Sequence, residues 1–165
     1  TATDELKNQI NFSSAYMNNS QVAVIRKADA PKYKDLASMS GAKVVAEAGS
    51  AGEIAVKADA GLSKSYLPVK DQGTSLMEVK SKTADIAIID AVTAAGSIGE
   101  GTDYDDLMIV DVISSADSEV YAVGIRKSDT ELTAKINAAI KELYDDGTLA
   151  KLAEKYNLSG RVIAQ

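Results

Sequence analysis

The chain contains no cysteine and no histidine among its 165 residues. Without cysteine it can form neither a disulfide nor a thiolate metal site, and it has no cysteine nucleophile. Without histidine it lacks the commonest general base and zinc ligand, so a serine triad of the usual kind is excluded. We expect no catalytic residue, no metal site and no cofactor.

The chain also lacks an excess of basic residues and any long apolar run. Its net charge is −6 and its pI about 4.7, whereas a nucleic-acid partner would need a basic surface. No stretch approaches the roughly 20 apolar residues that span a membrane. The longest apolar runs, such as IAII at 86–89, have the length of buried strands. The length suits one domain or two small lobes with a substantial core.

The first residues, TATDELKNQINFSSAY, show no charged n-region, no apolar h-region and no initiator methionine. They therefore do not have the pattern of a signal peptide. We expect the chain to be a processed, trimmed or artificially shortened piece of a longer protein.

Short β-branched runs alternate with stretches of helical period. The runs at 43–47, 84–90 and 107–113 are predicted strands, and the first two are apolar enough to be buried on both faces. The run at 65–69 is a weaker strand, because Pro68 suits a sheet edge. Helices are expected at about 52–60, 74–82 and 91–98. This alternation predicts an α/β fold with a parallel or mixed sheet flanked by helices.

Two amphipathic helices are predicted in the last third of the chain. Ser128 and Glu131 have the spacing of a capping box that opens the first helix, and DDG at 145–147 ends it. The second helix carries an apolar stripe at 149, 152, 153 and 156. Such a pair must pack against something, and we expect it to belong to a different lobe from the sheet.

One phrase occurs twice, as VAVIRKAD at 22–29 and as YAVGIRKSD at 121–129. Each copy is a strand-like run that ends in a basic pair and a turn. The sequences after the two copies differ, so an internal repeat is disfavoured. We interpret the copies as two strands that bracket an inserted α/β domain, as a two-strand hinge would.

Five segments resemble, in order and spacing, the amino-acid-type solute-binding proteins of bacterial ABC importers, family 3. They are TATDELKNQINFSSAY, DLASMSGAKVVAEAGSAGE, KTADIAIIDAVTA, YAVGIRKSDTEL and INAAIKELYDDGTLAKLAEKY. The resemblance implies a type II periplasmic-binding-protein fold, in which two hinged lobes trap a ligand between them. It implies the end of lobe 1 and the first hinge strand at 1–24, lobe 2 at 25–120, and the second hinge strand with the C-terminal helices of lobe 1 at 121–165. The chain would then hold one complete lobe and the C-terminal remnant of the other, without the N-terminal part of lobe 1.

The segment EAGSAGE at 47–53 lies where a strand passes into a helix. A helix N-terminus offers free N–H groups and a favourable dipole to an anion. The resemblance implies that Ser50, Ala51 and Gly52 hold the ligand carboxylate. The alternative from the residues alone is that Ser50 and Glu53 form an ordinary capping box.

Asp90 ends the predicted strand ADIAIID, at the sheet edge where open α/β sheets bind ligands. The resemblance implies that its carboxylate accepts the ligand ammonium, and that Thr1 and Thr3 contact the ligand from lobe 1. The alternative for Asp90 is a cap on the helix that follows, and the two roles are compatible.

Two positions bear on the choice of ligand. The family pattern continues T-x-T-x-E-R with an arginine that clamps the ligand carboxylate, and Leu6 stands at that position here. Glu47 lies at a position that in the family faces the pocket and is usually neutral or basic. It could favour a cationic ligand group, although a solvated carboxylate at a strand end is the simpler interpretation.

The leading hypothesis is a non-enzymatic, extracytoplasmic binding protein, periplasmic or a cell-surface lipoprotein, that presents a small amino-acid-like solute to a membrane permease. A dehydratase of the same fold is the enzyme alternative, with Glu47 as its candidate acid. An extracellular receptor sensor domain is a third. We also expect the exposed faces of the lobe 1 remnant to be covered, with a homodimer as one way of doing so.

Overall fold

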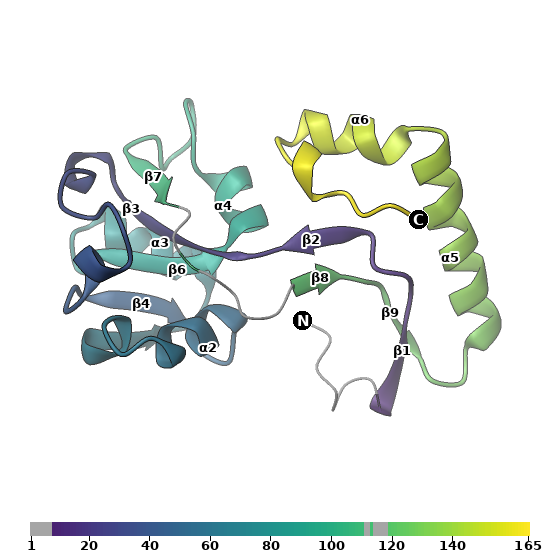
Figure 1. Ribbon diagram of the computed structural model, residues 1–165, viewed down its shortest axis with the longest axis horizontal. Coiled ribbons are helices and arrows are strands. Elements are labelled where there is room, and N and C mark those ends of the chain that lie inside the picture. Colours follow the sequence, from purple (N-terminus) through teal and green to yellow (C-terminus); the bar gives the residue numbers. More distant parts are fainter. Residues whose placement is uncertain (1–7, 111–112, 114–118) are drawn as a thin grey trace. The chain divides into compact units, whose positions relative to one another are not determined.

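The computed structural model describes residues 8–110, 113 and 119–165. The chain divides into two compact units (Figure 1). Unit 1 comprises Thr1–Asn19 and Asp117–Gln165, and unit 2 comprises Ser20–Ala116. The chain therefore passes between the units twice, whereas unit 2 is one continuous segment. The expected lobe boundaries were at 24/25 and 120/121.

Unit 2 is built on a five-stranded mixed sheet with the order β5-β4-β6-β3-β7. Strand β4 runs parallel to β5 and β6, and β3 runs antiparallel to β6 and β7. The expected parallel or mixed α/β sheet is confirmed. The strands are β3 (Gln21–Arg26), β4 (Val44–Glu47), β5 (Tyr66–Val69), β6 (Ile86–Asp90) and β7 (Leu107–Val110).

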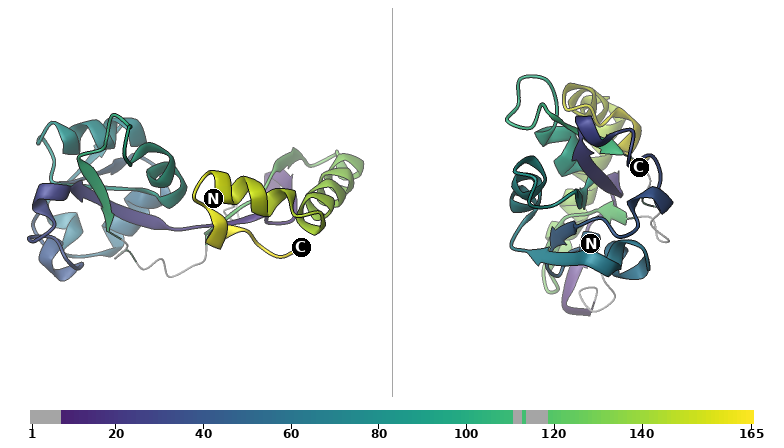
Figure 2. Two further views of the ribbon diagram at one scale, coloured as in Figure 1. Left: turned by 90° about the horizontal axis from the view of Figure 1, so that it is seen from above. Right: turned by 90° about the vertical axis from the view of Figure 1, so that its left-hand side faces the viewer.

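Helices cover both faces of this sheet, as Figure 2 shows from two further sides. Alternate residues of β3 point to opposite faces, so Ala23 and Ile25 join the core under one helix, while Val22 and Val24 join the core under the other two. The helices are α2 (Ala51–Ala58) on the first face, and α3 (Gln72–Lys80) and α4 (Ala91–Ser97) on the second.

The helices and strands of unit 2 begin and end close to the ranges that the sequence pattern predicts, except that residues 111 and 112 of the strand predicted at 107–113 lie outside the described residues. The Ser50 hydroxyl accepts a hydrogen bond from the Glu53 N–H at 3.1 Å, and Asp71 caps α3 in the same way through the Thr74 N–H at 2.7 Å. Strand β5 is an edge strand, which Pro68 tolerates because it has no N–H to donate.

Unit 1 consists of two antiparallel strand pairs and a helix pair. Strand β1 pairs with β9, and β2 with β8. Among the described residues of this unit only Ser13, Ile125 and Ala153 are buried, and none of them lies on α5. The elements are β1 (Ile10–Phe12), β2 (Met17–Asn19), β8 (Glu119–Tyr121), β9 (Gly124–Arg126), α5 (Thr130–Asp145) and α6 (Thr148–Lys155).

In helix α5 the predicted C-terminal signal is confirmed and the predicted N-terminal signal is wrong. Gly147 takes a left-handed φ of 78° and ends α5, as DDG predicts. The predicted capping box of Ser128 and Glu131 is wrong, because Asp129 is the N-cap residue and no side chain caps the helix. The Arg126 guanidinium holds the Asp129 carboxylate at 2.8 Å instead.

The two copies of the repeated phrase lie in different units. The first forms the interior strand β3, and the second runs through β8 and β9. Both end in the same local pair, since Arg26 contacts Asp29 and Arg126 contacts Asp129 three residues later. Their role as hinge strands stays a prediction.

Within the described residues, no helix has both the length and the apolar character needed to cross a membrane.

Candidate functional site

The sheet register of unit 2 gathers polar side chains at one edge. Strands β4, β5 and β6 all end there, and antiparallel β3 begins there, with Gln21 opposite Asp90 and Glu47 opposite Val69. The carboxyl ends of parallel strands in an open α/β sheet are the usual place for a ligand. The loop into α2 and the surroundings of Asp90 both lie at this edge.

The loop into α2 has the structure of a capped helix N-terminus. Ser50 accepts from Glu53, so the capping alternative for this residue is observed. The next two N–H groups, of Ala51 and Gly52, belong to the first turn, where a helix supplies no acceptor. No acceptor for them lies among the described residues. They remain available to an anion, and the helix dipole favours one there.

Glu53 holds this loop in place through three donors. Its carboxylate accepts from Lys57 Nζ at 2.8 Å, from the Gly49 N–H at 2.7 Å and from the Tyr66 hydroxyl at 3.0 Å. Hydrogen bonds from Lys57, Gly49 and Tyr66 lower the pKa of Glu53 to about 2. Burial, together with the neighbouring Glu53, raises the pKa of Tyr66 to about 12. Glu53 is thus a structural anion that fixes the loop.

Asp90 is held by two glutamines that the sequence analysis missed. Gln21 Nε2 donates to its Oδ1 at 2.7 Å, and Gln72 Nε2 donates to its Oδ2 at 3.1 Å. Asp90 precedes α4, but its side chain makes no capping bond to that helix. A polar residue at the head of the apolar run QVAVI was the available sequence signal for Gln21.

Gln21 also lies against the first turn of α2. A Cβ atom built on Gly52 would be 3.1 Å from Gln21 Oε1 and 2.8 Å from the carbonyl oxygen of Ile88. Only glycine allows the helix to approach β3 and β6 this closely. Through this approach Ser50, Ala51, Gly52 and Asp90 are brought to one edge of the sheet.

The other predicted site residues are placed differently. Glu47 ends β4, half-buried, and its carboxylate makes no hydrogen bond or ion pair with the described residues. Thr1, Thr3 and Leu6 lie outside the described residues. Within the described part of the chain, no group of three or more acidic side chains could hold a metal ion.

The edge therefore offers an anion-accepting helix N-terminus and an oriented carboxylate. A zwitterion has a group for each of them.

Comparison with known proteins shows the family of the chain. The family model of bacterial extracellular solute-binding proteins, family 3, matches residues 1–159. The arginine-binding extracellular protein ArtP of Bacillus subtilis (strain 168) is 32% identical over 160 residues, which is 94% of this chain and 60% of ArtP. The chain thus spans well under two thirds of the length of this relative.

Two solved structures share the fold. An amino acid ABC transporter substrate-binding protein from Streptococcus pneumoniae Canada MDR_19A, bound to L-arginine, is 28% identical with a TM-score of 0.79, over 99% of this chain and 66% of that one. The ancestral amino acid-binding protein AncCDT-1, a precursor of cyclohexadienyl dehydratase, is 30% identical with a TM-score of 0.77, over 94% of this chain and 65% of that one. The chain belongs to the bacterial extracellular solute-binding proteins of family 3.

Proposed function

We propose that the chain is part of the extracytoplasmic solute-binding component of an ABC importer, and that it binds an amino acid or a related small polar solute. The observation that carries the proposal is the pairing of two opposite polar features at one sheet edge. The first turn of α2 has N–H groups that find no acceptor among the described residues, and Asp90 presents a carboxylate at the same sheet edge. Membership of the family supports the same role.

In this proposal the solute carboxylate binds at α2 and its ammonium at Asp90. The Ala51 and Gly52 N–H groups, with Ser50, receive the carboxylate because the helix dipole favours negative charge there. Contacts of Thr1 and Thr3 with the solute, and hinge closure on it, stay predictions of the family resemblance.

A cationic amino acid is the first solute to test. ArtP is named an arginine-binding protein, and the Streptococcus structure contains L-arginine. Glu47 supplies a half-buried carboxylate at the same sheet edge. It has no partner among the described residues, and an unpaired carboxylate favours a cationic ligand group. Leu6 cannot donate to a carboxylate, so the α2 turn would have to hold the ligand carboxylate without an arginine clamp.

Calorimetric titration with L-arginine, L-glutamine and agmatine tests the proposal. Saturable binding of L-arginine is expected, with weaker binding of agmatine, because agmatine lacks the carboxylate that α2 receives. An Asp90→Asn variant should weaken L-arginine binding by about tenfold or more, since a charged hydrogen bond is lost. Equal affinity of wild type and variant, or no binding of any amino acid, would contradict the proposal.

We propose that the chain has no catalytic activity of its own. The enzyme alternative has one supporting observation, the similarity to a precursor of cyclohexadienyl dehydratase, and Glu47 is its candidate acid. Incubation with prephenate or arogenate separates the two, because product formation that is lost in a Glu47→Gln variant would establish the dehydratase.

For partners and location, we propose a membrane permease as the acceptor of the solute, and a periplasmic or lipid-anchored parent protein. We also propose that a second copy covers the exposed apolar residues of unit 1. Each of these side chains is more than a third exposed. The residues are Val123, Leu132, Leu143, Leu152 and Tyr156.

A further inference from the structure

The Asp90 carboxylate has a donor on each of its two oxygens. Gln21, from β3, donates to Oδ1, and Gln72, from the first turn of α3, donates to Oδ2. Rotation of the carboxylate would break at least one of these bonds, and bonds to a charged acceptor are the stronger kind. Its orientation is therefore determined by two elements outside β6.

Gln72 makes a two-point contact with Asp90. Its Nε2 donates to the side chain at 3.1 Å, while its Oε1 accepts from the Asp90 N–H at 3.2 Å. A carboxamide donates from its nitrogen and accepts at its oxygen, so Gln72 can make both bonds at once. The contact ties the end of β6 to the start of α3.

Gln21 reaches both features of the binding edge. It is 1% exposed and stands directly opposite Asp90 in the β3–β6 ladder. Its Oε1 lies where a Cβ on Gly52 would come within 3.1 Å. This one side chain therefore lies against the first turn of α2 and also donates to Asp90.

We propose that Gln21 and Gln72 are positioning residues of the solute site. Both carboxamides are neutral, so they orient the Asp90 carboxylate without cancelling the negative charge that a cationic group of the solute would meet. Gln21 also couples the orientation of Asp90 to the position of the α2 turn. The inference rests on the proposed function only in assigning Asp90 to the solute.

The test replaces each glutamine by methionine, which has a similar length and cannot donate. Three-bond NMR couplings from Asp90 Cγ to its backbone nitrogen and carbonyl carbon report χ1 without any ligand. A single rotamer is expected in the wild type, and averaged couplings are expected in Gln21→Met and in Gln72→Met. Gln165→Met is the matched control, because Gln165 donates to Ala15 and Ile163 within unit 1 and should leave the Asp90 couplings unchanged.

Titration with L-arginine is the second measurement on the same variants. Each substitution should weaken binding by about tenfold, the effect of one charged hydrogen bond. Gln72 is only partly buried, so Gln72→Met keeps the test open if the buried Gln21→Met variant does not fold. Wild-type couplings in a folded variant would overturn the positioning role. A third outcome separates the two proposals. If the wild type binds no solute but the couplings are averaged in the variants, the positioning role is supported and the proposed function is rejected.

Discussion

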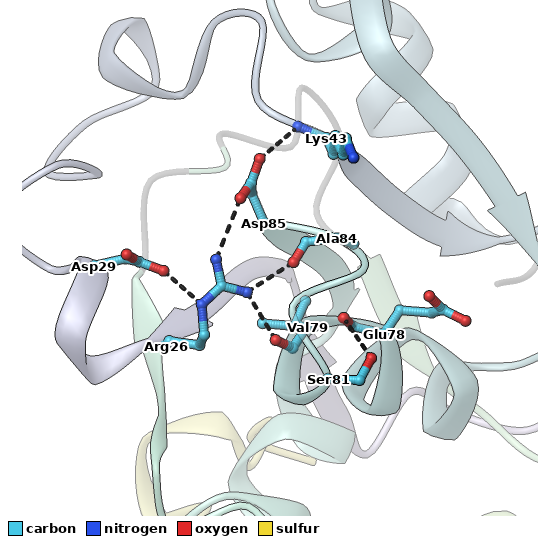
Figure 3. A network of polar contacts seen from close by, with 8 residues as sticks. All are labelled: Arg26, Asp29, Lys43, Glu78, Val79, Ser81, Ala84 and Asp85. Carbon is cyan, nitrogen blue, oxygen red and sulfur yellow. Dashed lines mark hydrogen bonds and ion pairs between the residues drawn. The ribbon is translucent and has the colours of Figure 1, made fainter.

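Arg26 and Arg126 stand at the same place in the two copies of one phrase, yet they have different surroundings. Arg26 is 13% exposed, and its guanidinium contacts Asp29 at 2.6 Å, Asp85 at 3.2 Å and the carbonyl oxygens of Val79 and Ala84 at 2.7 Å each (Figure 3). Arg126 is 85% exposed and contacts Asp129. The same local pair is therefore a junction of several elements in one unit and a surface contact in the other.

Substitution of these arginines by methionine tests that difference. Arg26→Met should lower the free energy of unfolding by about 3 kcal/mol, because two carboxylates and two carbonyl oxygens lose their donor. Arg126→Met should change it by less than about 0.5 kcal/mol, as exposed ion pairs do. Urea unfolding followed by circular dichroism measures both. Equal losses would mean that the Arg26 contacts add nothing to the shared Arg–Asp pair.

Glu53 gives the stability of unit 2 an acid dependence. Its pKa falls from 4.5 to about 2 on folding, so the unfolded chain takes up a proton at this residue before the folded chain does. The stabilisation is present above about pH 4.5 and is lost as the pH falls toward 2. Glu53→Gln should be less stable than wild type at pH 7, and the difference should close over this range. Thermal melts from pH 7 to pH 2 measure it, and a constant difference would contradict the assignment.

Tyr66 makes the stability of unit 2 depend on pH in the alkaline range, where stability is lost as the pH rises. Its pKa rises from 10 to about 12 on folding, so the unfolded chain loses this proton first. Stability that is present below pH 10 should therefore be lost as the pH rises toward 12. Tyr66→Phe should remove this part of the alkaline slope. The comparison of alkaline unfolding midpoints checks it, with an unchanged slope as the contrary result.

At the scale of elements, the contact between α2 and the sheet depends on a missing side chain. A methyl group on Gly52 would lie 2.8 Å from the Ile88 carbonyl oxygen, which is backbone and cannot turn aside. Gly52→Ala should therefore lower the free energy of unfolding by about 1–3 kcal/mol, the usual cost of overpacking. It should also weaken solute binding, because α2 must move away from Gln21.

Gly96 provides the matched control in helix α4. A Cβ atom there meets nothing within 4 Å, so Gly96→Ala should stabilise the protein by about 0.5–1 kcal/mol through helix propensity alone. Urea unfolding should therefore show a lower free energy of unfolding for Gly52→Ala and a higher one for Gly96→Ala. Stabilisation by both substitutions would show that α2 can shift without cost.

The elements of unit 2 were predictable because their signals are local. The apolar run before Asp90 and the capping box at Ser50 specify β6 and the start of α2 within a few residues of sequence. The roles of Gln21 and Gln72 were not predictable, because these residues are 69 and 18 positions from Asp90 in the sequence. One sequence does not show which strands pair. The capping box at Ser128 failed because the helix begins one residue later than predicted, with Asp129 at the N-cap.

At the scale of the molecule, the apolar core belongs to unit 2. Both hydrophobic clusters lie wholly within Ser20–Ala116. This continuous segment should fold without the rest of the chain, because its buried contacts are internal and its size is that of a small domain. The excised segment should unfold cooperatively and give amide NMR shifts for β3–β6 like those of the whole chain. A fragment without dispersed shifts would show that unit 1 is required.

Unit 1 has the opposite character, and this predicts self-association of the whole chain. Among its described residues only Ile125 and Ala153 are buried hydrophobics, while Leu152 and Tyr156 on and after α6 are 46% and 58% exposed. Exposed apolar faces of this kind bind a partner, and a second copy is always present in a purified sample. Sedimentation velocity over a concentration series should therefore show a dimer for the whole chain.

Charge substitutions locate the surface responsible. Leu152→Lys combined with Tyr156→Lys should leave a monomer, because two buried ammonium groups would cost more than the dimer gains. Ile54→Lys combined with Met77→Lys is the control, since these side chains are 67% and 62% exposed but belong to unit 2, and it should leave the dimer intact. A dimer that survives the first pair and is lost with the second would place the contact on unit 2. A monomer at all concentrations of the whole chain would mean that the exposed face of unit 1 does not bind a second copy.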